Sequence, residues 1–272
     1  MGRTWRSALR TAGAAAAIMA GAGLMTGCSS IGGDVERTAL ITEVDPSTGI
    51  GSAITGRVTE PGDHSIHGID VAKYQGTIDW TGVRASGVAF AFIKATEGGD
   101  RVDERFAENW ANARAAGVAR GAYHFYYFCR TGAEQARWFI ENVPNDPGAL
   151  PPVLDMEWNH LSPSCKRRPP REEVLKEMSV FLSMVERHFG KRPAIYTSVD
   201  FHRDILVGAF PGYHFWLRSV AGHPSLKYHA SRRFSFWQHT ATGRIGGVTG
   251  DVDRNVYMGD AASFRRFAAT GR

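Results

Sequence analysis

Cysteine is scarce in this chain, and none of it stands at the spacing of a metal ribbon or a redox motif. Three cysteines occur among 272 residues, at Cys28, Cys129 and Cys165. Because no C-x-x-C pair is present, neither a zinc ribbon nor a thioredoxin-like centre is supported. The acidic residues also lack histidines at ligand spacing, so we expect no metal and no cofactor.

The chain lacks a strong charge of either sign. It holds 32 basic and 27 acidic residues. Arg3, Arg6 and Arg10 fall in the first ten residues, which leaves 29 basic against 27 acidic residues, a net charge of +2, in the remainder. No basic helix with interleaved aromatic residues occurs, so we do not expect nucleic acid as a partner.

No hydrophobic run is long enough to be a clear membrane span. The first residues combine arginines with an apolar stretch of about 17 residues, which is short for a spanning helix. This pattern predicts a secretory signal peptide over 1–27. Leu24-Met-Thr-Gly-Cys28 resembles a bacterial lipobox, in which the cysteine is lipidated. We expect a lipoprotein exported to the bacterial cell envelope, periplasmic or on the outer surface, and anchored to a membrane through Cys28. An ordinary signal peptide cut nearby is the alternative.

Aromatic residues are absent from the segment that follows. Residues 29–63 contain no Phe, Tyr or Trp and are rich in Gly, Ser, Thr and acidic residues. Such a segment buries little apolar surface, so we predict a flexible tether over 28–63, with room for a short strand or two. Aromatic residues become frequent from His64 on, which predicts one domain over 64–272. We expect that domain to be a monomer.

Two cysteines lie inside that domain. An exported chain with two cysteines favours one disulfide between them. Cys129 follows a strand-like stretch that ends at Phe128, and Cys165 lies in the loop after Glu157. We expect the bridge to brace the loops beside that residue; two free buried thiols are the alternative.

Apolar stretches alternate with helical patterns along the domain. Helical spacing is clearest over 172–189, and 104–116 and 133–143 are two further predicted helices. The expected strands are 67–72, 88–95, 119–128, 151–157, 193–197, 215–218, 234–239 and 252–257. Continuous apolar strands that alternate with helices indicate a parallel sheet covered by helices. About eight strands in roughly 200 residues predict an α/β fold, a single irregular β/α barrel. The last connections are short, so we expect that part to be partly antiparallel.

The tripeptide Asp155-Met-Glu157 is the most informative feature of the chain. It ends an apolar strand, so Asp155 and Glu157 should point to one face and Met156 to the other, with the two Cα atoms about 6.5 Å apart. Two carboxyl groups this close resist ionising together, so one can keep its proton near neutral pH. A proton donor beside an anion is what the cleavage of a glycosidic bond requires.

Further polar residues end neighbouring strands of the predicted barrel. Asp70 ends the first strand, Lys94 ends the second, and Asp253 lies in the last. Polar residues at the carboxyl ends of barrel strands converge on one site. The first and last strands meet when a barrel closes, so we expect Asp70 and Asp253 to be neighbours and Lys94 to pair with the acids.

These residues also belong to a longer pattern. The chain from His67 to Gly259 resembles glycoside hydrolase family 25, the Chalaropsis-type lysozymes or N-acetylmuramidases. The matching blocks include Gly68-Ile-Asp-Val-Ala-Lys-Tyr-Gln-Gly76, Phe92-Ile-Lys-Ala-Thr-Glu-Gly98, Gly121-Ala-Tyr-His-Phe125, Pro152-Val-Leu-Asp-Met-Glu157, Pro193-Ala-Ile-Tyr-Thr197, Trp237-Gln238 and Gly250-Asp-Val-Asp253. Seven blocks in register make the match specific. The run Phe215-Trp-Leu-Arg-Ser-Val220 departs from the family, which usually has a Trp-Ile-Ala-x-Tyr-like run there.

The resemblance implies hydrolysis of the β-1,4 bond between N-acetylmuramic acid and N-acetylglucosamine in peptidoglycan glycan strands. It implies that Glu157 is the general acid and that Asp155 assists the 2-acetamido group of the substrate, with retention of configuration. Asp70 and Asp253 complete the acidic cluster. Apolar neighbours and other acids should raise the pKa of Glu157, in keeping with this role.

Polar and aromatic side chains near the strand ends complete the expected substrate contacts. These residues are Lys94, Tyr123, Trp158, Tyr196, Trp237 and Gln238. Two other functions stay open: a catalytically silent lipoprotein that binds peptidoglycan, and a hydrolase of a related amino-sugar polymer such as chitin. A binding module would be free to lose Glu157 or Asp155, and both are present.

Overall fold

The computed structural model describes residues 40–44, 51–55, 58–159, 162, 164–228 and 232–272. The predicted signal peptide, Cys28 and much of the predicted tether lie outside these residues and stay predictions. Two short strands, β1 (Leu40–Val44) and β2 (Gly51–Thr55), pair antiparallel in the tether region. None of the helices in the described ranges is long and apolar enough to cross a membrane.

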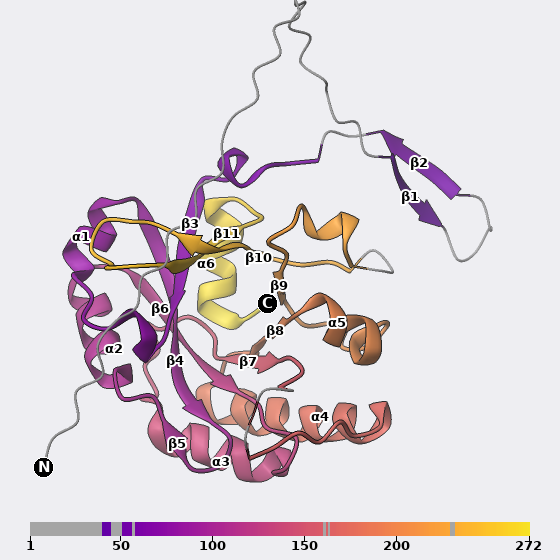
Figure 1. Ribbon diagram of the computed structural model, residues 1–272, viewed down its shortest axis with the longest axis horizontal. Helices are drawn as coiled ribbons and strands as arrows, with labels where there is room; N and C mark the ends of the chain where they lie inside the picture. Colours follow the sequence, from indigo (N-terminus) through magenta and orange to yellow (C-terminus); the bar gives the residue numbers. More distant parts are fainter. Residues whose placement is uncertain (1–39, 45–50, 56–57, 160–161, 163, 229–231) are drawn as a thin grey trace, which may run out of the picture. The chain divides into compact units, whose positions relative to one another are not determined.

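Eight strands of the described domain close into one barrel (Figure 1). In chain order they are β3 (Ile66–Val71), β4 (Val88–Glu97), β6 (Ala119–Phe125), β7 (Val153–Met156), β8 (Ala194–Thr197), β9 (Phe215–Arg218), β10 (Phe236–Gly243) and β11 (Val252–Tyr257). They follow one another around the barrel as β3-β11-β10-β9-β8-β7-β6-β4, and β3 also pairs with β4. The short β5 (Arg101–Val102) extends the edge of β4.

The direction of the strands changes at one place. β11 runs antiparallel to both β10 and β3, whereas the other six barrel pairs are parallel. The connection from Gly243 at the end of β10 to Val252 at the start of β11 is short and holds no helix, so β11 returns beside β10 as an antiparallel strand. The prediction of an irregular β/α barrel with a partly antiparallel end is confirmed.

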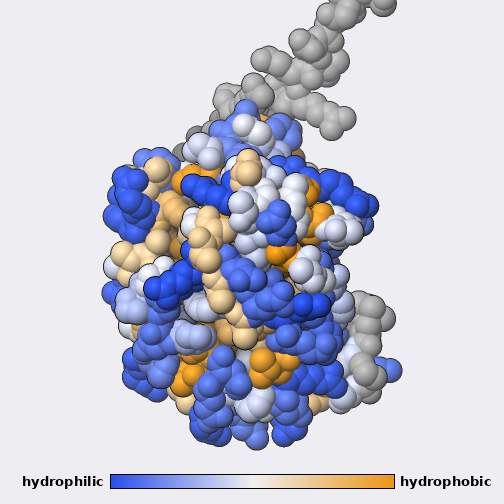
Figure 2. All heavy atoms as spheres, turned by 90° about the vertical axis from the view of Figure 1, so that its left-hand side faces the viewer, coloured by the Kyte–Doolittle hydropathy of each residue, from blue (hydrophilic) through white to orange (hydrophobic). Residues whose placement is uncertain are grey.

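Helices cover the outer wall beside the parallel strands. The longer ones are α1 (Trp80–Ala85), α2 (Phe106–Ala115), α3 (Gly132–Asn142) and α4 (Arg171–Phe189), whereas the C-terminal α6 (Ala261–Thr270) packs against the inner cluster at one end of the barrel. Shorter turns are η1 (Pro61–Asp63), η2 (Lys73–Gln75), α5 (Val199–Phe201), η3 (His202–Leu206) and η4 (Pro224–Leu226). Hydrophilic residues cover most of the face that lies on the left of Figure 1, where α1 and α2 stand (Figure 2). The apolar sides of the helices therefore pack inward.

Strand alternation divides the buried side chains into two clusters. Leu154 and Met156 of β7 join the cluster between the strands and the helices, and Val153 joins the cluster inside the barrel. On β9, Leu217 belongs to the outer cluster and Trp216 to the inner one. Since successive strand residues point to opposite faces, these memberships also fix the direction of Asp155 and Arg218: both point into the barrel.

Helix α6 contributes to the interior of the barrel. The side chain of Phe267 is fully buried, and its ring centroid lies 4.9 Å from that of Phe236 at the start of β10. The interior is already full here, because a Cβ at Gly68 would come within 2.4 Å of the Phe90 ring. This end of the barrel, at the amino ends of the parallel strands, is therefore closed by aromatic side chains.

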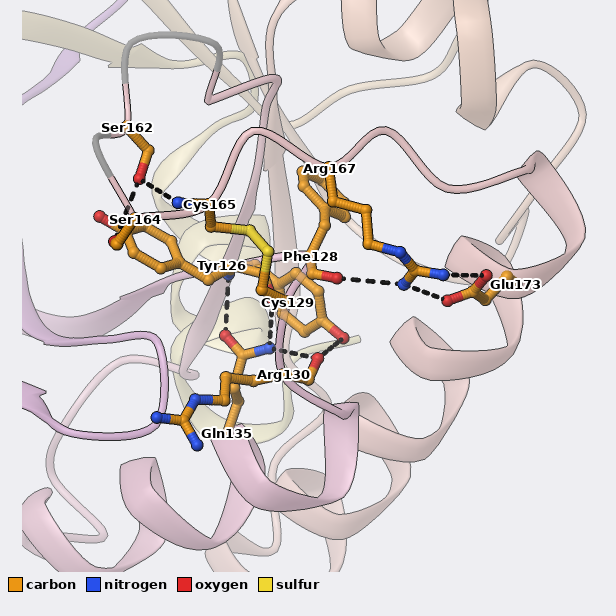
Figure 3. Close-up of a disulfide and its surroundings, with 11 residues drawn as sticks. Tyr126, Phe128, Cys129, Arg130, Gln135, Ser162, Ser164, Cys165, Arg167 and Glu173 are labelled. Carbon is orange, nitrogen blue, oxygen red and sulfur yellow. Dashed lines mark hydrogen bonds and ion pairs between the residues drawn. A yellow bond between two sulfur atoms is a disulfide. The ribbon is translucent and has the colours of Figure 1, made fainter.

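A disulfide joins the loops that follow β6 and β7 (Figure 3). Cys129 and Cys165 are bonded, with their Cα atoms 5.8 Å apart, which confirms the predicted pair. β6 ends at Phe125 and not at Phe128 as predicted. The chain turns because the Tyr127 backbone N–H donates to Gln135 Oε1 and its carbonyl accepts from Gln135 Nε2, so this stretch binds α3 instead of a neighbouring strand.

Candidate active site

The carboxyl ends of the parallel strands open into a cleft of about 420 Å³. It is lined by residues of β3, β4, β6, β7, β8, β9, β10 and β11 and of the turn η2. All four carboxylates named from the sequence, Asp70, Asp155, Glu157 and Asp253, lie in it. The structure therefore brings together groups that are up to 183 residues apart in the chain.

Asp70 and Asp253 face each other across neighbouring strands. They are direct partners in the antiparallel register of β3 and β11, as expected from closure of the barrel. Asp70 Oδ2 accepts hydrogen bonds from Gln238 Nε2 at 2.9 Å and from Asn255 Nδ2 at 2.8 Å. Burial, and after it the charge of Asp253, raises the pKa of Asp70 to about 8, against the opposing effect of the two amide donors. Asp70 is therefore protonated at neutral pH.

A second layer of hydrogen bonds fixes the orientation of those two amides. Tyr196 donates its hydroxyl to Gln238 Oε1 at 2.9 Å, and Trp216 Nε1 donates to Asn255 Oδ1 at 2.7 Å. Each amide oxygen is thus occupied, and each NH₂ group is directed at Asp70. Tyr196 and Gln238, both predicted to touch substrate, line the cleft and also hold this buried network in place.

Asp155 and Glu157 form the other half of the acidic cluster. Asp155 is 6% exposed, and its Oδ1 is buried without a hydrogen-bond partner among the described residues. Burial, followed by the charge of Glu157, raises the pKa of Asp155 well above its usual range. Burial also raises the pKa of Glu157, with the nearby charge of Arg218 acting in the opposite direction. A half-buried carboxyl with a raised pKa can hold a proton for transfer.

Two positively charged side chains, Lys94 and Arg218, line the cleft, and they differ in their bonds to other residues. Lys94 lies in the cleft, but its ion pair is with Glu97, at 2.6 Å, so the expectation that it pairs with the acidic cluster needs correction. Glu97 is the ion-pair partner of Lys94 because it lies three residues further along the same strand. Its carboxylate is also held by a hydrogen bond that it accepts from the Tyr127 hydroxyl. Arg218, at the end of β9, lines the same cleft.

The aromatic residues expected to bind sugars fall into two groups. Tyr123 and Tyr196 line the cleft, whereas Trp158 and Trp237 are not among its lining residues. Trp237 is 3% exposed and donates from Nε1 to the Ser219 carbonyl at 2.8 Å. It alternates with Gln238, which points inward, so it must point outward.

Trp158 lies outside the cleft for the same reason. It follows Met156 at an interval of two residues, on the outer side of the barrel. Its ring packs on Phe128 with centroids 5.1 Å apart, and its Nε1 donates to Asp204 Oδ2 at 2.9 Å.

An aromatic residue that the sequence reasoning did not select stands at the rim instead. Tyr74 lies in η2, directly after the strand that carries Asp70, and its side chain is 79% exposed while it lines the cleft. The position of Tyr74 in the sequence could have indicated this role, because the loops after the carboxyl ends of barrel strands build the active sites of this architecture.

A second cavity, of about 400 Å³, is lined by Cys129 of the disulfide and by the acidic residues Glu134, Glu173 and Glu177. Its acids are already bonded within the protein: Glu173 to Arg167, Glu177 to the Gly132 backbone N–H, and Glu134 to Thr131. These carboxylates cap helices and pair charges, so this cavity lacks an acid available for catalysis. No group of three or more potential ligand side chains able to hold a metal ion occurs in the parts of the chain described above.

Comparison with known proteins identifies the family to which this barrel and its acidic cleft belong. The chain belongs to glycosyl hydrolases family 25, whose model matches residues 69–248. It is 36% identical over 212 residues to the uncharacterized protein YegX of Escherichia coli K12, covering 76% of this chain and 75% of that protein. It is 35% identical over 223 residues to lysozyme M1 of Streptomyces globisporus, covering 79% of this chain and 75% of the lysozyme.

Solved structures agree with the fold. A family 25 glycosyl hydrolase from Bacillus anthracis superimposes with a TM-score of 0.71 at 38% identity, covering 78% of this chain and 97% of the other. A bacterial lysozyme from Streptomyces coelicolor gives a TM-score of 0.67 at 35% identity, covering 75% of this chain and 97% of the lysozyme. The barrel and its cleft are therefore those of a family 25 glycoside hydrolase.

Proposed function

We propose that the protein is an N-acetylmuramidase that hydrolyses the β-1,4 bond between N-acetylmuramic acid and N-acetylglucosamine in peptidoglycan. The observation that carries the proposal is the pair Asp155, on β7, and Glu157, directly after β7, which both line the cleft and have raised pKa values. The relationship to lysozyme M1 supports the choice of peptidoglycan as substrate.

In the proposed first step, Glu157 donates its proton to the glycosidic oxygen as the bond to the anomeric carbon breaks. The carbonyl oxygen of the substrate's own 2-acetamido group bonds to the anomeric carbon from the opposite face. The unpartnered Oδ1 of Asp155 is suited to accept a hydrogen bond from the acetamido N–H, which orients the acetamido carbonyl oxygen toward the anomeric carbon. In the second step Glu157 accepts a proton from water as the water attacks the anomeric carbon. Two displacements give net retention.

Asp70 has a supporting role in this proposal. A protonated Asp70 can donate a hydrogen bond to Asp253 or to substrate while the two amides hold its other oxygen. It therefore places a neutral donor, and not a further negative charge, beside the reacting sugar.

We also propose that the protein is an exported lipoprotein, held at the cell envelope through Cys28 and the tether over 28–63. The disulfide supports export, because such bonds persist in oxidising compartments. Mass spectrometry of the N-terminus after extraction from membranes tests this; an unmodified terminus contradicts it.

The test of the activity is to replace Glu157 by glutamine. The purified protein and Glu157→Gln are incubated with peptidoglycan, the products are reduced with borohydride, and the new ends are identified by mass spectrometry. We expect reduced muramic acid at the new ends from the parent, and a rate about 10³-fold lower from Glu157→Gln, because the proton donor is lost while the shape is kept.

Glu141→Gln is the matched control, since Glu141 is exposed on the outer helix α3. It should digest peptidoglycan at the parental rate. If neither the parent nor the control releases fragments while both sediment with the wall, the protein is a binding module and the proposed reaction is wrong.

A further inference from the structure

Arg218 brings a positive charge into a cleft that is lined mainly by acidic groups. Its side chain is half-buried and lines the cleft together with the four carboxylates. No carboxylate of the described residues lies within 4.0 Å of its guanidinium, and its side chain donates no hydrogen bond to them. A guanidinium carries five N–H donors in a fixed planar fork, and these are all available here.

Lys94 provides a direct contrast inside the same cleft. Its ammonium is bound by Glu97, and the side chains of that pair are 12% and 18% exposed. The charge of Lys94 is therefore already compensated within the protein. Arg218 acts on the carboxyl groups of Glu157 and Asp253 through its charge and without a direct bond among the described residues, so its N–H donors remain available to a group that enters the cleft.

The backbone that carries Arg218 is firmly held. The Tyr228 hydroxyl donates to the carbonyl of Arg218 at 2.8 Å and to that of Thr197 at 2.9 Å, which ties the ends of β9 and β8 together. The Ser219 backbone N–H donates to the Gln238 carbonyl at 2.9 Å. The backbone at Arg218 is thus fixed, and the N–H donors of its side chain remain available, which suits a residue that positions a ligand group.

Support of the catalytic acid does not account for this arginine. Its charge lowers the pKa values of Glu157 and Asp253, whereas a general acid benefits from a raised pKa. An arginine that works against proton retention and makes no structural bond needs a different role.

We infer that Arg218 is a specificity-determining residue that binds a carboxylate of the glycan substrate through its guanidinium fork. This rests on the proposed hydrolysis of peptidoglycan and narrows its substrate. Arginine and carboxylate form paired, charge-assisted hydrogen bonds that discriminate strongly against a neutral group. In peptidoglycan that carboxylate is either the free lactyl group of muramic acid without a peptide stem, or a carboxylate of the stem itself.

The experiment measures kcat and KM of the parent, Arg218→Ala and Arg218→Lys on four soluble glycans. These are stem-free strands with free lactyl carboxylates, the same strands as methyl esters, stem-bearing strands, and stem-bearing strands with methylated carboxylates. Arg137→Ala, which removes an exposed arginine of α3, controls for a general attraction to anionic glycans.

We expect the parent to have a KM about 10-fold lower for the charged member of one pair of glycans than for its ester. Arg218→Ala should raise KM about 10-fold on that charged glycan alone, with kcat less affected, and Arg218→Lys should give an intermediate KM. The pair that shows the difference identifies the source of the carboxylate: the stem-free pair indicates the lactyl group, and the stem-bearing pair indicates the stem.

Two results would overturn the inference while leaving the activity established. One is equal KM of the parent for charged and esterified strands of both kinds. The other is an equal rise of KM on charged and esterified strands in Arg218→Ala, which indicates a structural effect. Failure of the parent to cleave any of the four glycans is a third result, which instead overturns the proposed reaction and the inference with it.

Discussion

The two ends of the barrel interior are built by the same strands and have opposite character. At one end, Phe90, Phe236 and Phe267 fill the space between the strands. At the other end, Asp70 and Asp155 stand in an open cleft of about 420 Å³. Along β3, β7 and β10 the inward-pointing residues change from apolar to polar within two to four positions.

The difference shows how the fold separates stability from chemistry. The closed end gains stability from buried apolar surface and aromatic contacts. At the open end, burial raises the pKa values of the carboxyl groups. These groups therefore bind protons more tightly in the folded protein than in the unfolded chain. As the pH rises from the pKa of such a group in the unfolded chain to its pKa in the folded protein, the free energy of unfolding falls. Mutations at the two ends should therefore change stability in opposite directions.

The largest effect is expected at the closed end, from Phe267→Ala. The fully buried ring contacts Phe236 and Tyr257, so its removal leaves a cavity that α6 cannot fill. We expect the free energy of unfolding to fall by about 3–5 kcal/mol, measured by urea denaturation. The pH dependence of kcat should be unchanged at a temperature where the variant is folded.

Arg265→Ala is the control for this change, because Arg265 is exposed on the same helix. It should alter the free energy of unfolding by less than about 0.5 kcal/mol. A loss below about 1 kcal/mol in Phe267→Ala would mean that α6 does not close the barrel as described.

The second effect has the opposite sign and lies at the open end. Asparagine at position 70 can still accept the hydrogen bonds of Gln238 and Asn255 but has no proton to lose. The unfolded Asp70 ionises near pH 3.8 and the folded one at about 8, so the folded state of the parent loses stability as pH rises across this interval. We expect Asp70→Asn to raise the free energy of unfolding at pH 7 by about 1–3 kcal/mol and to have little effect below pH 4.

The measurement is denaturant unfolding of the parent and of Asp70→Asn at a series of pH values. Asp251→Asn, an exposed residue next to β11, should follow the parental curve. A variant less stable than the parent at pH 7 would show that Asp70 is ionised and stabilised in the folded state, contrary to the pKa direction given above.

Much of the open end could be predicted from the sequence, because its signals are local. The strand before Asp155 and Glu157 is short, apolar and followed by loop residues, so the alternation of side chains placed both carboxylates on one face. Closure of the barrel placed Asp70 beside Asp253, as the register of β3 and β11 has it. The same alternation, applied to Met156 and Trp158, would have turned that tryptophan away from the cleft.

Other features depend on contacts that the local pattern does not contain. In β9, the run from Phe215 to Leu217 is apolar throughout, so alternation alone does not say which face is inward. The choice is made by Trp216, whose Nε1 bonds Asn255 of β11. Helix α6 has clear caps in Asp260 and Gly271, yet its place across the closed end of the barrel depends on Phe267, whose ring meets those of Phe236 in β10 and Tyr257 in β11.

The smallest effect concerns affinity at the open end. Tyr74 is 79% exposed at the rim of the cleft, so Tyr74→Ala should leave the free energy of unfolding unchanged. It removes a ring on which a sugar can stack, worth about 1 kcal/mol, so we expect KM for peptidoglycan strands to rise about 5-fold with kcat little changed. Trp237→Phe is the contrasting variant: it loses the hydrogen bond to the Ser219 carbonyl and should lower stability without changing KM. If Trp237→Phe raised KM and Tyr74→Ala did not, the tryptophan would reach substrate after all, and the division between inward and outward residues of β10 would be wrong.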